Sequence, residues 1–166
     1  MRTLLLMRHA KSSWDDESLP DEERPLNERG KAAAIKMGKF LRDEDLVPDL
    51  ILTSPAKRAR QTADRVKEAG RLDAPIVQNP HLYFAGAEAY FDAIETTPNA
   101  VHTLLVIGHN PDIESLLARI TRHPVRMPTA AIAQIAVAAE DWRAIRLATA
   151  CKLKDVYRPK ELAGRD

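Results

Sequence analysis

The sequence predicts an α/β protein of three layers, in which helices flank a mainly parallel central sheet. Two observations lead to this prediction. Short apolar runs, which are typical of buried strands, alternate along the chain with longer segments of helical period. Each run is followed by a cluster of polar residues, as expected where parallel strands end at a ligand-binding edge. We expect one domain over residues 1–166, with an ordered core over 1–158 and a tail over 159–166.

Three strands and four helices are predicted in this order. Continuous apolar runs place the strands at residues 3–7, 50–53 and 103–107. Apolar residues at helical spacing place the helices at residues 27–42, 56–69, 87–95 and 112–121. Ser54-Pro55 and Asn110-Pro111 each set a capping side chain before a proline, which suits the first position of a helix. Two of the strand-to-helix corners are therefore expected at these prolines.

The remaining segments predict a long loop and a closing hairpin. The polar segment of residues 11–24 contains several acids and Pro20, and it predicts the loop. Residues 131–138 are rich in small and β-branched side chains, and residues 142–150 alternate imperfectly between apolar and polar. We expect these two segments to pair as a C-terminal antiparallel hairpin.

Composition excludes several classes of function. The chain has 25 basic and 24 acidic residues, so its net charge of +1 offers no general field for nucleic acid or an anionic membrane. No stretch approaches the roughly 20 apolar residues of a membrane helix, and the opening run is too short for a signal peptide. The single cysteine, Cys151, excludes an intramolecular disulfide and is interpreted as an inert thiol. We expect a soluble, cytoplasmic monomer.

The first polar cluster begins with Arg8-His9, directly after the first predicted strand. A guanidinium fork binds a phosphoryl group through two hydrogen bonds, and a neutral imidazole beside it is a competent nucleophile. Such a pair also occurs at ordinary exposed strand ends, so the other clusters have to decide between the two interpretations.

The second cluster lies at the start of the helix after residues 50–53, where free backbone amides and the helix dipole suit an anion. Lys57, Arg58 and Arg60 are the cations available there. Successive helical residues point about 100° apart, so these three side chains do not all face one site. Geometry favours Arg58 but leaves the other two open.

The third cluster is Gly108-His109-Asn110-Pro111, which brings His109 to the same sheet edge. A histidine that only hydrogen-bonds its own turn is the alternative. His81, His102 and His123 lack this context and are interpreted as structural or exposed. His9 and His109 are too few for a metal site, because no cysteine or clustered histidine completes a ligand set.

These motifs together resemble the histidine phosphatase superfamily, which also contains the cofactor-dependent phosphoglycerate mutases. The resemblance spans residues 1–150. Its motifs are Arg8-His9-Ala10-Lys11 with Trp14, the segment Glu23-Arg24-Pro25-Leu26-Asn27-Glu28-Arg29-Gly30, Ser54-Pro55 with Arg58-Ala59 and Gln61-Thr62, and Gly108-His109-Asn110-Pro111. The short chain and the Arg-His-Ala-Lys start look most like the SixA-type phosphohistidine phosphatase branch. The family's usual glycine is replaced by Ala10, which would be strained if the backbone needed a positive φ.

The resemblance implies a phosphoglycerate mutase-like fold and assigns roles to four residues. His9 would become phosphorylated, Arg8 and Arg58 would hold the phosphoryl oxygens, and His109, when protonated, would stabilise the transferring charge. No metal and no cofactor is implied. The substrate would be phosphohistidine on a protein, or a small phosphorylated molecule. A phosphohistidine needs little help to leave, because imidazole has a pKa near 6.5.

Two alternatives remain at this stage. A broad phosphomonoesterase needs a general acid, for which Glu88 and Asp92 are candidates, although a carboxylate at a helix start is also an ordinary dipole partner. A phosphoprotein-binding module without turnover is the other alternative, but binding alone would require only the arginines and not both histidines. A mutase is disfavoured because the chain lacks insertions that would enclose a sugar phosphate.

Overall fold

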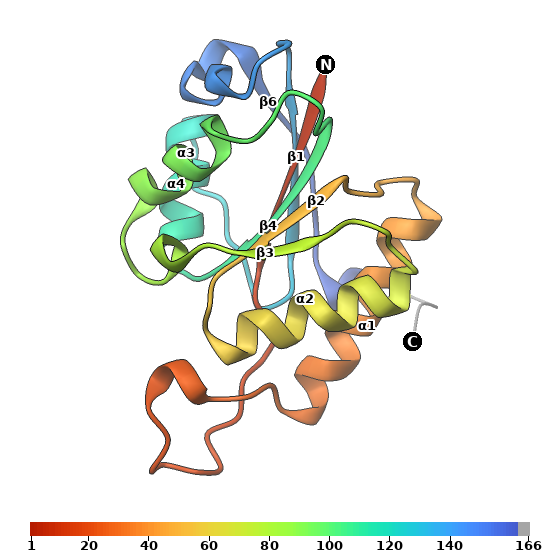
Figure 1. The fold of residues 1–166 in the computed structure, drawn as a ribbon, viewed down its shortest axis with the longest axis vertical. Coiled ribbons are helices and arrows are strands. Elements are labelled where there is room, and N and C mark those ends of the chain that lie inside the picture. The colour runs from red at the N-terminus through yellow and green to blue at the C-terminus, as the bar shows by residue number, and fades with distance from the viewer. Residues whose placement is uncertain (163–166) are drawn as a thin grey trace.

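The computed structural model describes residues 1–162 and contains one six-stranded sheet with the strand order β3-β2-β4-β1-β5-β6. Figure 1 shows this sheet crossing the molecule, with α1 and α2 on one side and α3 and α4 on the other. The strands are β1 (Arg2–Arg8), β2 (Leu50–Thr53), β3 (Ile76–Gln78), β4 (Thr103–Gly108), β5 (Ile132–Val137) and β6 (Cys151–Tyr157). The helices are α1 (Glu28–Asp43), α2 (Lys57–Gly70), α3 (Ala87–Glu95) and α4 (Asp112–Thr121).

The pairing of the strands confirms the predicted fold class. β1 pairs in parallel with β4, and β2 pairs in parallel with both β3 and β4. β5 is antiparallel to β1, and β6 is antiparallel to β5, so the sheet closes with an antiparallel hairpin. The carboxyl ends of β1, β2 and β4 therefore lie side by side, which is the edge where the polar clusters were expected.

Two apolar cores, one on each face of the sheet, fix the layers. Successive residues of a strand point to opposite faces, so Leu4 and Leu6 enter the core under α3 and α4, whereas Leu5 and Met7 enter the core under α1 and α2. All four side chains are fully buried. A strand buried on both faces reads as a continuous apolar run, which is why β1, β2 and β4 could be found in the sequence.

The predicted hairpin was correct in its first strand and wrong in its second. Residues 142–150 form two 3-10 helices, Trp142–Arg146 and Ala148–Ala150, and the second strand of the hairpin is β6. The spacing of three residues between the buried Trp142 and Ile145 matches the 3-10 period, in which residues i and i+3 eclipse. The short strand β3 was not predicted, and only one of its three residues is half-buried.

The helix predicted over residues 112–121 is confirmed, and the start predicted at residue 56 is one residue early, but neither Pro55 nor Pro111 stands at the first helical position as expected. α2 begins at Lys57 without a side-chain cap, and Ser54 Oγ instead accepts the Ala56 amide at 3.2 Å within the preceding turn. α4 begins at Asp112, after a cis Asn110-Pro111 peptide, with Asn110 Oδ1 accepting the Glu114 amide at 3.2 Å. Both serine and asparagine thus stabilise the corner rather than capping the helix from the expected position.

Residues 11–24 form the expected loop, which carries a 3-10 turn at Asp21–Glu23 and returns to the fold through a bridge between Ser12 and Leu26. Near the other end, residues 159–161 form a 3-10 helix, and the Pro159 carbonyl accepts from Lys36 Nζ at 3.1 Å. The rest of the expected tail, residues 163–166, lies outside the described residues. Within residues 1–162, no helix is both long and apolar enough to cross a membrane.

Candidate active site

The carboxyl ends of β1, β2 and β4 bring the three sequence clusters together. The His9 amide donates to the Gly108 carbonyl at 3.0 Å, and the Ser54 amide donates to the Ile107 carbonyl at 3.0 Å. These bonds continue the parallel pairing one residue past the strands. The rings of His9 and His109 consequently lie with their centroids 5.0 Å apart, so residues 100 positions apart in sequence share one site.

Of the two nitrogens of the His9 ring, only Nδ1 has a hydrogen-bond partner among residues 1–162. Nδ1 lies 2.7 Å from the Ala10 carbonyl, and a carbonyl only accepts, so Nδ1 carries the proton. In the neutral ring the lone pair is therefore on Nε2. His9 is 7% exposed, and burial lowers its pKa to about 4. The hydrogen bond to Ala10 opposes this shift, and the charges of nearby arginines add to it.

Ala10 replaces the family's glycine without strain. It is absent from the positive-φ residues of the described chain, and its side chain is fully buried in the core under α1 and α2. Its amide donates to Thr62 Oγ1 at 3.0 Å, and that hydroxyl donates to the Arg58 carbonyl at 2.7 Å. Thr62 thereby ties the loop after β1 to the first turn of α2.

His109 is 1% exposed and is held from two sides. Its amide donates to the Tyr90 hydroxyl at 3.1 Å, and its Nε2 lies 2.7 Å from Ser54 Oγ. Nδ1 is buried without a partner among residues 1–162. Burial lowers the pKa of His109 to about 3, and the charges of His9 and Arg58 add to the shift. The lowered pKa favours a neutral His109 in the free site, so the condition under which it would add positive charge, protonation of its ring, is not met there.

Arg58 is the residue of the second cluster that enters the site. It is 2% exposed, whereas Lys57 and Arg60 are half-buried, and Arg60 Nε donates to the Pro55 carbonyl at 2.8 Å. Arg58 Nη1 donates to the Asp21 carbonyl at 2.7 Å, and Nη2 donates to Asp21 Oδ2 at 2.9 Å. An acid from the long loop thus occupies the guanidinium fork that would hold a phosphoryl group.

Arg8 is the last residue of β1 and directly precedes His9. Its Nη1 donates to the Met127 carbonyl at 3.2 Å, and its Nε is buried without a partner among the residues that the structure describes. Burial lowers the pKa of Arg8, and the charge of Glu114 opposes that shift. Arg8 and Arg58 thus come from different elements, β1 and α2, and the charges of both lower the pKa of His9.

Arg24 belongs to the site and was missed. It is 7% exposed, and its Nη2 donates to Ser12 Oγ at 2.6 Å. Its Nε and Nη1 make no hydrogen bond within residues 1–162, although Nε lies 3.5 Å from the Asp21 carboxylate. Burial and the charge of Arg58 lower the pKa of Arg24, and the charge of Arg24 in turn lowers the pKa of His9. The available signal was its place in the Glu23-Arg24-Pro25-Leu26 motif, to which we had assigned no role.

Tyr83 and Phe84 complete the rim. Tyr83 donates its hydroxyl to Asp21 Oδ2 at 2.6 Å. Phe84 has a φ of 55°, which is uncommon for a bulky residue, and its ring centroid lies 4.8 Å from that of His109. Half of Phe84 remains exposed, so an aromatic surface borders the site next to the histidines.

The carboxylates proposed as general acids are committed elsewhere. Glu88 accepts from Arg119 at 2.7 Å and from Arg146 at 2.9 Å, and these hydrogen bonds lower its pKa. Asp92 accepts from the same Arg146 at 2.6 Å. Both carboxylates belong to an exposed ion-pair network that joins α3 to α4 and to the 3-10 helix at Trp142–Arg146. Glu88, whose pKa is lowered, therefore has no proton to give a leaving group.

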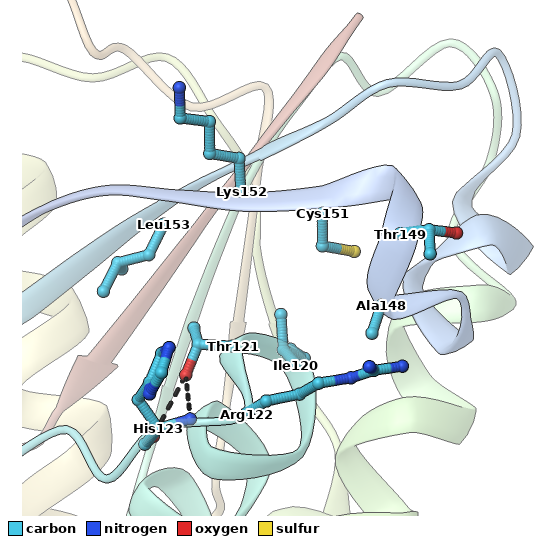
Figure 2. Close-up of a pocket in the computed structure, with 9 residues that line it drawn as sticks. All are labelled: Ile120, Thr121, Arg122, His123, Ala148, Thr149, Cys151, Lys152 and Leu153. Atoms are coloured by element: carbon cyan, nitrogen blue, oxygen red, sulfur yellow. Dashed lines mark hydrogen bonds between the residues drawn. The ribbon is translucent and has the colours of Figure 1, made fainter.

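Other chemistry-bearing groups lie apart from this site. Within residues 1–162, no group of three or more His, Cys, Asp or Glu side chains is arranged to hold a metal ion. A hollow of about 420 Å³ lies between the end of α4 and β6, and none of the four predicted site residues lines it. Figure 2 shows its lining residues, among them Cys151. Burial raises the pKa of the Cys151 thiol, so the thiolate that would react is disfavoured.

Comparison with known proteins agrees with this geometry. Residues 4–83 match the family model of the histidine phosphatase superfamily, branch 1. A solved structure from Agrobacterium tumefaciens, provisionally assigned as phosphohistidine phosphatase SixA, is 30% identical, with a TM-score of 0.80 over 95% of this chain and 98% of that one. The chain belongs to the histidine phosphatase superfamily. Within this superfamily it is of the SixA type, since a second structure so assigned, from Nakamurella multipartitia, is 27% identical with a TM-score of 0.81 over 95% of this chain and 96% of that one.

A protein identified by sequence alone is also similar to this chain. An uncharacterised protein of Mycobacterium tuberculosis is 37% identical over 143 residues, which are 80% of this chain and 87% of the relative. Membership of the superfamily supports a phosphatase. It leaves the substrate and the roles of individual residues to be inferred from the site.

Proposed function

We propose that the chain hydrolyses phosphohistidine on a protein, through an intermediate in which His9 is phosphorylated. The observation that carries this proposal is the state of His9: neutral, with Nδ1 bound to a carbonyl and the Nε2 lone pair free, among three buried or half-buried arginines. A nucleophile must be unprotonated to attack, and the guanidinium groups supply the charge that a phosphoryl group requires.

In the first step Nε2 of His9 attacks phosphorus and the bond from phosphorus to the substrate's histidine nitrogen breaks. Arg8, Arg24 and Arg58 hold the phosphoryl oxygens, and Arg58 exchanges its bonds to Asp21 for bonds to the phosphoryl group. The departing imidazole is neutral because its other nitrogen carries a proton taken from solvent, which its ordinary pKa near 6.5 allows. No protein acid is needed for this leaving group.

In the second step water attacks the phosphorus of phospho-His9. The bond to Nε2 breaks, inorganic phosphate leaves, the water proton passes to solvent, and His9 returns to its neutral form. His109, neutral in the free site, has an unpartnered Nδ1 and a Ser54 hydroxyl at Nε2, so it can donate one hydrogen bond to the transferring group. We propose that neither step requires a metal ion or a cofactor.

The ionised state of Asp21, at the site, and of Glu88, the candidate general acid, favours this substrate over a phosphate ester. Burial opposes ionisation of Asp21, but hydrogen bonds from Tyr83 and Arg58 outweigh it and lower its pKa. Glu88 is ionised and paired with two arginines. An alkoxide leaving group is strongly basic and needs a proton donor, whereas a phosphoramidate does not. These ionised carboxylates therefore support phosphohistidine as the substrate.

The test compares a phosphohistidine peptide with a simple alkyl phosphate, using the native chain, His9→Ala and the control His123→Ala, which changes an exposed histidine. We expect preference for the phosphohistidine peptide, its loss in His9→Ala, its retention in His123→Ala, and full activity in EDTA. Rapid quenching in alkali followed by mass spectrometry should find a phosphoryl group on His9. Preference for the alkyl phosphate would refute the substrate, and phosphate binding without turnover would indicate a binding module.

A further inference from the structure

A basic groove opens beside Arg8 and is not used by the proposed mechanism. One hollow, of about 380 Å³, is lined by Arg8, Glu114, Arg126, Met127, Pro128 and Arg158. A second, of about 440 Å³, includes Lys11, Arg29, Pro128, Arg158, Lys160 and Glu161 in its lining. The two hollows share Pro128 and Arg158, so they adjoin, and together they are called the basic groove; Arg8, to which the proposed mechanism gives a phosphoryl-binding role, lines the first.

Positive charge is concentrated in this groove beyond what its carboxylates compensate. Six cationic side chains line it against the two carboxylates of Glu114 and Glu161, in a chain whose net charge is only +1. Glu161 lies 3.8 Å from Arg158, and Glu114 accepts the Met127 amide at 2.8 Å. Four of the six cations have side chains without a hydrogen-bond or ion-pair partner among residues 1–162: Lys11, Arg29, Arg126 and Lys160.

This concentration is unfavourable for the protein by itself. Like charges gathered on one surface repel, and Arg29 lies in the first turn of α1, where the helix dipole disfavours a cation. The four unpartnered cations come from separate segments of the chain: the loop after β1, the start of α1, the segment after α4 and the segment after β6. An anionic partner that lies along the groove would compensate all of them.

We propose that the groove binds an acidic segment of the phosphoprotein, beside the phosphohistidine that enters the active site; this inference rests on the proposed function. A single phosphate group would call for buried, converging donors, whereas these four cations are exposed and spread along the groove. Several carboxylates on an extended segment match that arrangement. Nucleic acid is disfavoured because the chain as a whole offers no positive field.

Negative charge on the loop that follows Lys11 gives the partner one orientation. The loop of residues 11–24 exposes Asp15, Asp16, Glu17, Asp21, Glu22 and Glu23, and Asp21 contacts Arg58. The basic groove, by contrast, contacts Arg8. A segment with acids on one side of its phosphohistidine is attracted to the groove and repelled by the loop, so only one direction of binding is favourable.

The experiment uses two synthetic peptides with one phosphohistidine each, flanked by Asp and Glu in one and by Asn and Gln in the other. The groove variant carries Arg126→Glu and Lys160→Glu. The control variant carries Lys152→Glu and Lys154→Glu, which make the same change of charge at exposed positions of β6. The native chain and the control should favour the acidic peptide in kcat/KM by on the order of 10-fold at low salt. The groove variant should lose that preference, and 0.5 M salt should remove it from all three proteins.

The proposal would be overturned if the groove variant still preferred the acidic peptide. It would also be overturned if the variant lost kcat/KM equally on the acidic and the neutral peptide. If the native chain hydrolyses neither peptide, the proposed function fails and the groove is tested by binding alone. Fluorescence anisotropy of the unphosphorylated acidic peptide then supports the groove if the groove variant abolishes binding. It refutes the groove if the native chain does not bind. Tighter binding of an RNA oligonucleotide of equal charge would overturn the acidic protein segment as the occupant.

Discussion

The burial of His9 and His109 should make the stability of the fold depend on pH. Their pKa values in the folded chain are about 4 and about 3, against about 6.5 in the unfolded chain. Between pH 6.5 and the folded value, the unfolded chain binds a proton that the folded chain does not bind. The stability contribution is therefore complete above pH 6.5 and is lost as the pH falls towards the folded pKa.

The magnitude follows from the width of that window. From pH 6.5 to pH 5 the free energy of unfolding falls by about 1.4 kcal/mol per pH unit for each histidine, which is about 2 kcal/mol per histidine. Urea unfolding at pH 7 and pH 5, followed by the fluorescence of the buried Trp142, measures the loss. His9→Gln and His109→Gln should each reduce it by about 2 kcal/mol. His123→Gln, which makes the same change at an exposed position, should leave it unaltered.

An equal loss of stability in the native chain and in both site variants would refute the neutral, buried histidines on which the mechanism depends. The same pKa predicts the acid limb of the activity. Because His9 stays unprotonated in the free site, kcat/KM should be maintained as the pH falls through 6 and should decline only as it approaches about 4.

Three further predictions concern single residues. Gly108→Ala would place a Cβ against the Tyr90 hydroxyl and 2.8 Å from its Cζ, so we expect a destabilisation of about 1–3 kcal/mol in urea unfolding and a loss of activity, because the same hydroxyl holds the His109 amide. Arg24→Met should weaken inhibition by inorganic phosphate and move the acid limb of kcat/KM to higher pH, since the Arg24 charge lowers the pKa of His9; an unmoved limb would place Arg24 outside the site. Glu88→Gln should leave kcat/KM unchanged on both the phosphohistidine peptide and the alkyl phosphate, and a selective loss on the alkyl phosphate would restore Glu88 as a general acid.

The parts of the fold that were predicted correctly are those with a strong periodic signal. β1, β2 and β4 are buried on both faces, and their apolar runs are unbroken. β6 was missed because it is an exposed edge strand whose sequence contains Lys152, Lys154 and Asp155. Charged residues protect such an edge from pairing with other chains, and they also hide it from a search for apolar alternation.

The second strand of the hairpin was predicted at residues 142–150 because that segment contains buried apolar residues. Trp142 and Ile145 are almost fully buried, so residues 142–150 carry an apolar signal, but a 3-10 helix produces it. The sequence alone also left open which of Lys57, Arg58 and Arg60 enters the site. The phase of α2 is set by where the helix begins, and Ala56 provides no capping side chain from which that start could be read.

The missed site residues, Asp21 and Arg24, lie on the loop of residues 11–24, which has no periodicity. Their positions depend on contacts with distant parts of the chain: Asp21 with Arg58 and Tyr83, and the loop with Leu26. Such contacts exist only once the sheet has brought the corners together. Residue type and position after a strand were enough to select Arg8 and Arg58. They were not enough to show that the loop places Arg24 and Asp21 next to them.

The neutral state of His9 is connected with the arginines that surround it. Burial lowers the pKa of His9 most, and the charges of Arg58, Arg8 and Arg24 lower it further. In the proposed mechanism the arginines that hold the phosphoryl oxygens therefore also help to keep the attacking histidine unprotonated. A phosphoryl dianion would compensate those charges and raise the basicity of His9 Nε2 as the new bond forms. Because burial also favours the neutral form of His109 in the free site, the proposed mechanism assigns the positive charge for transfer to the arginines, and Asp21 would compensate part of it until the phosphoryl group arrives.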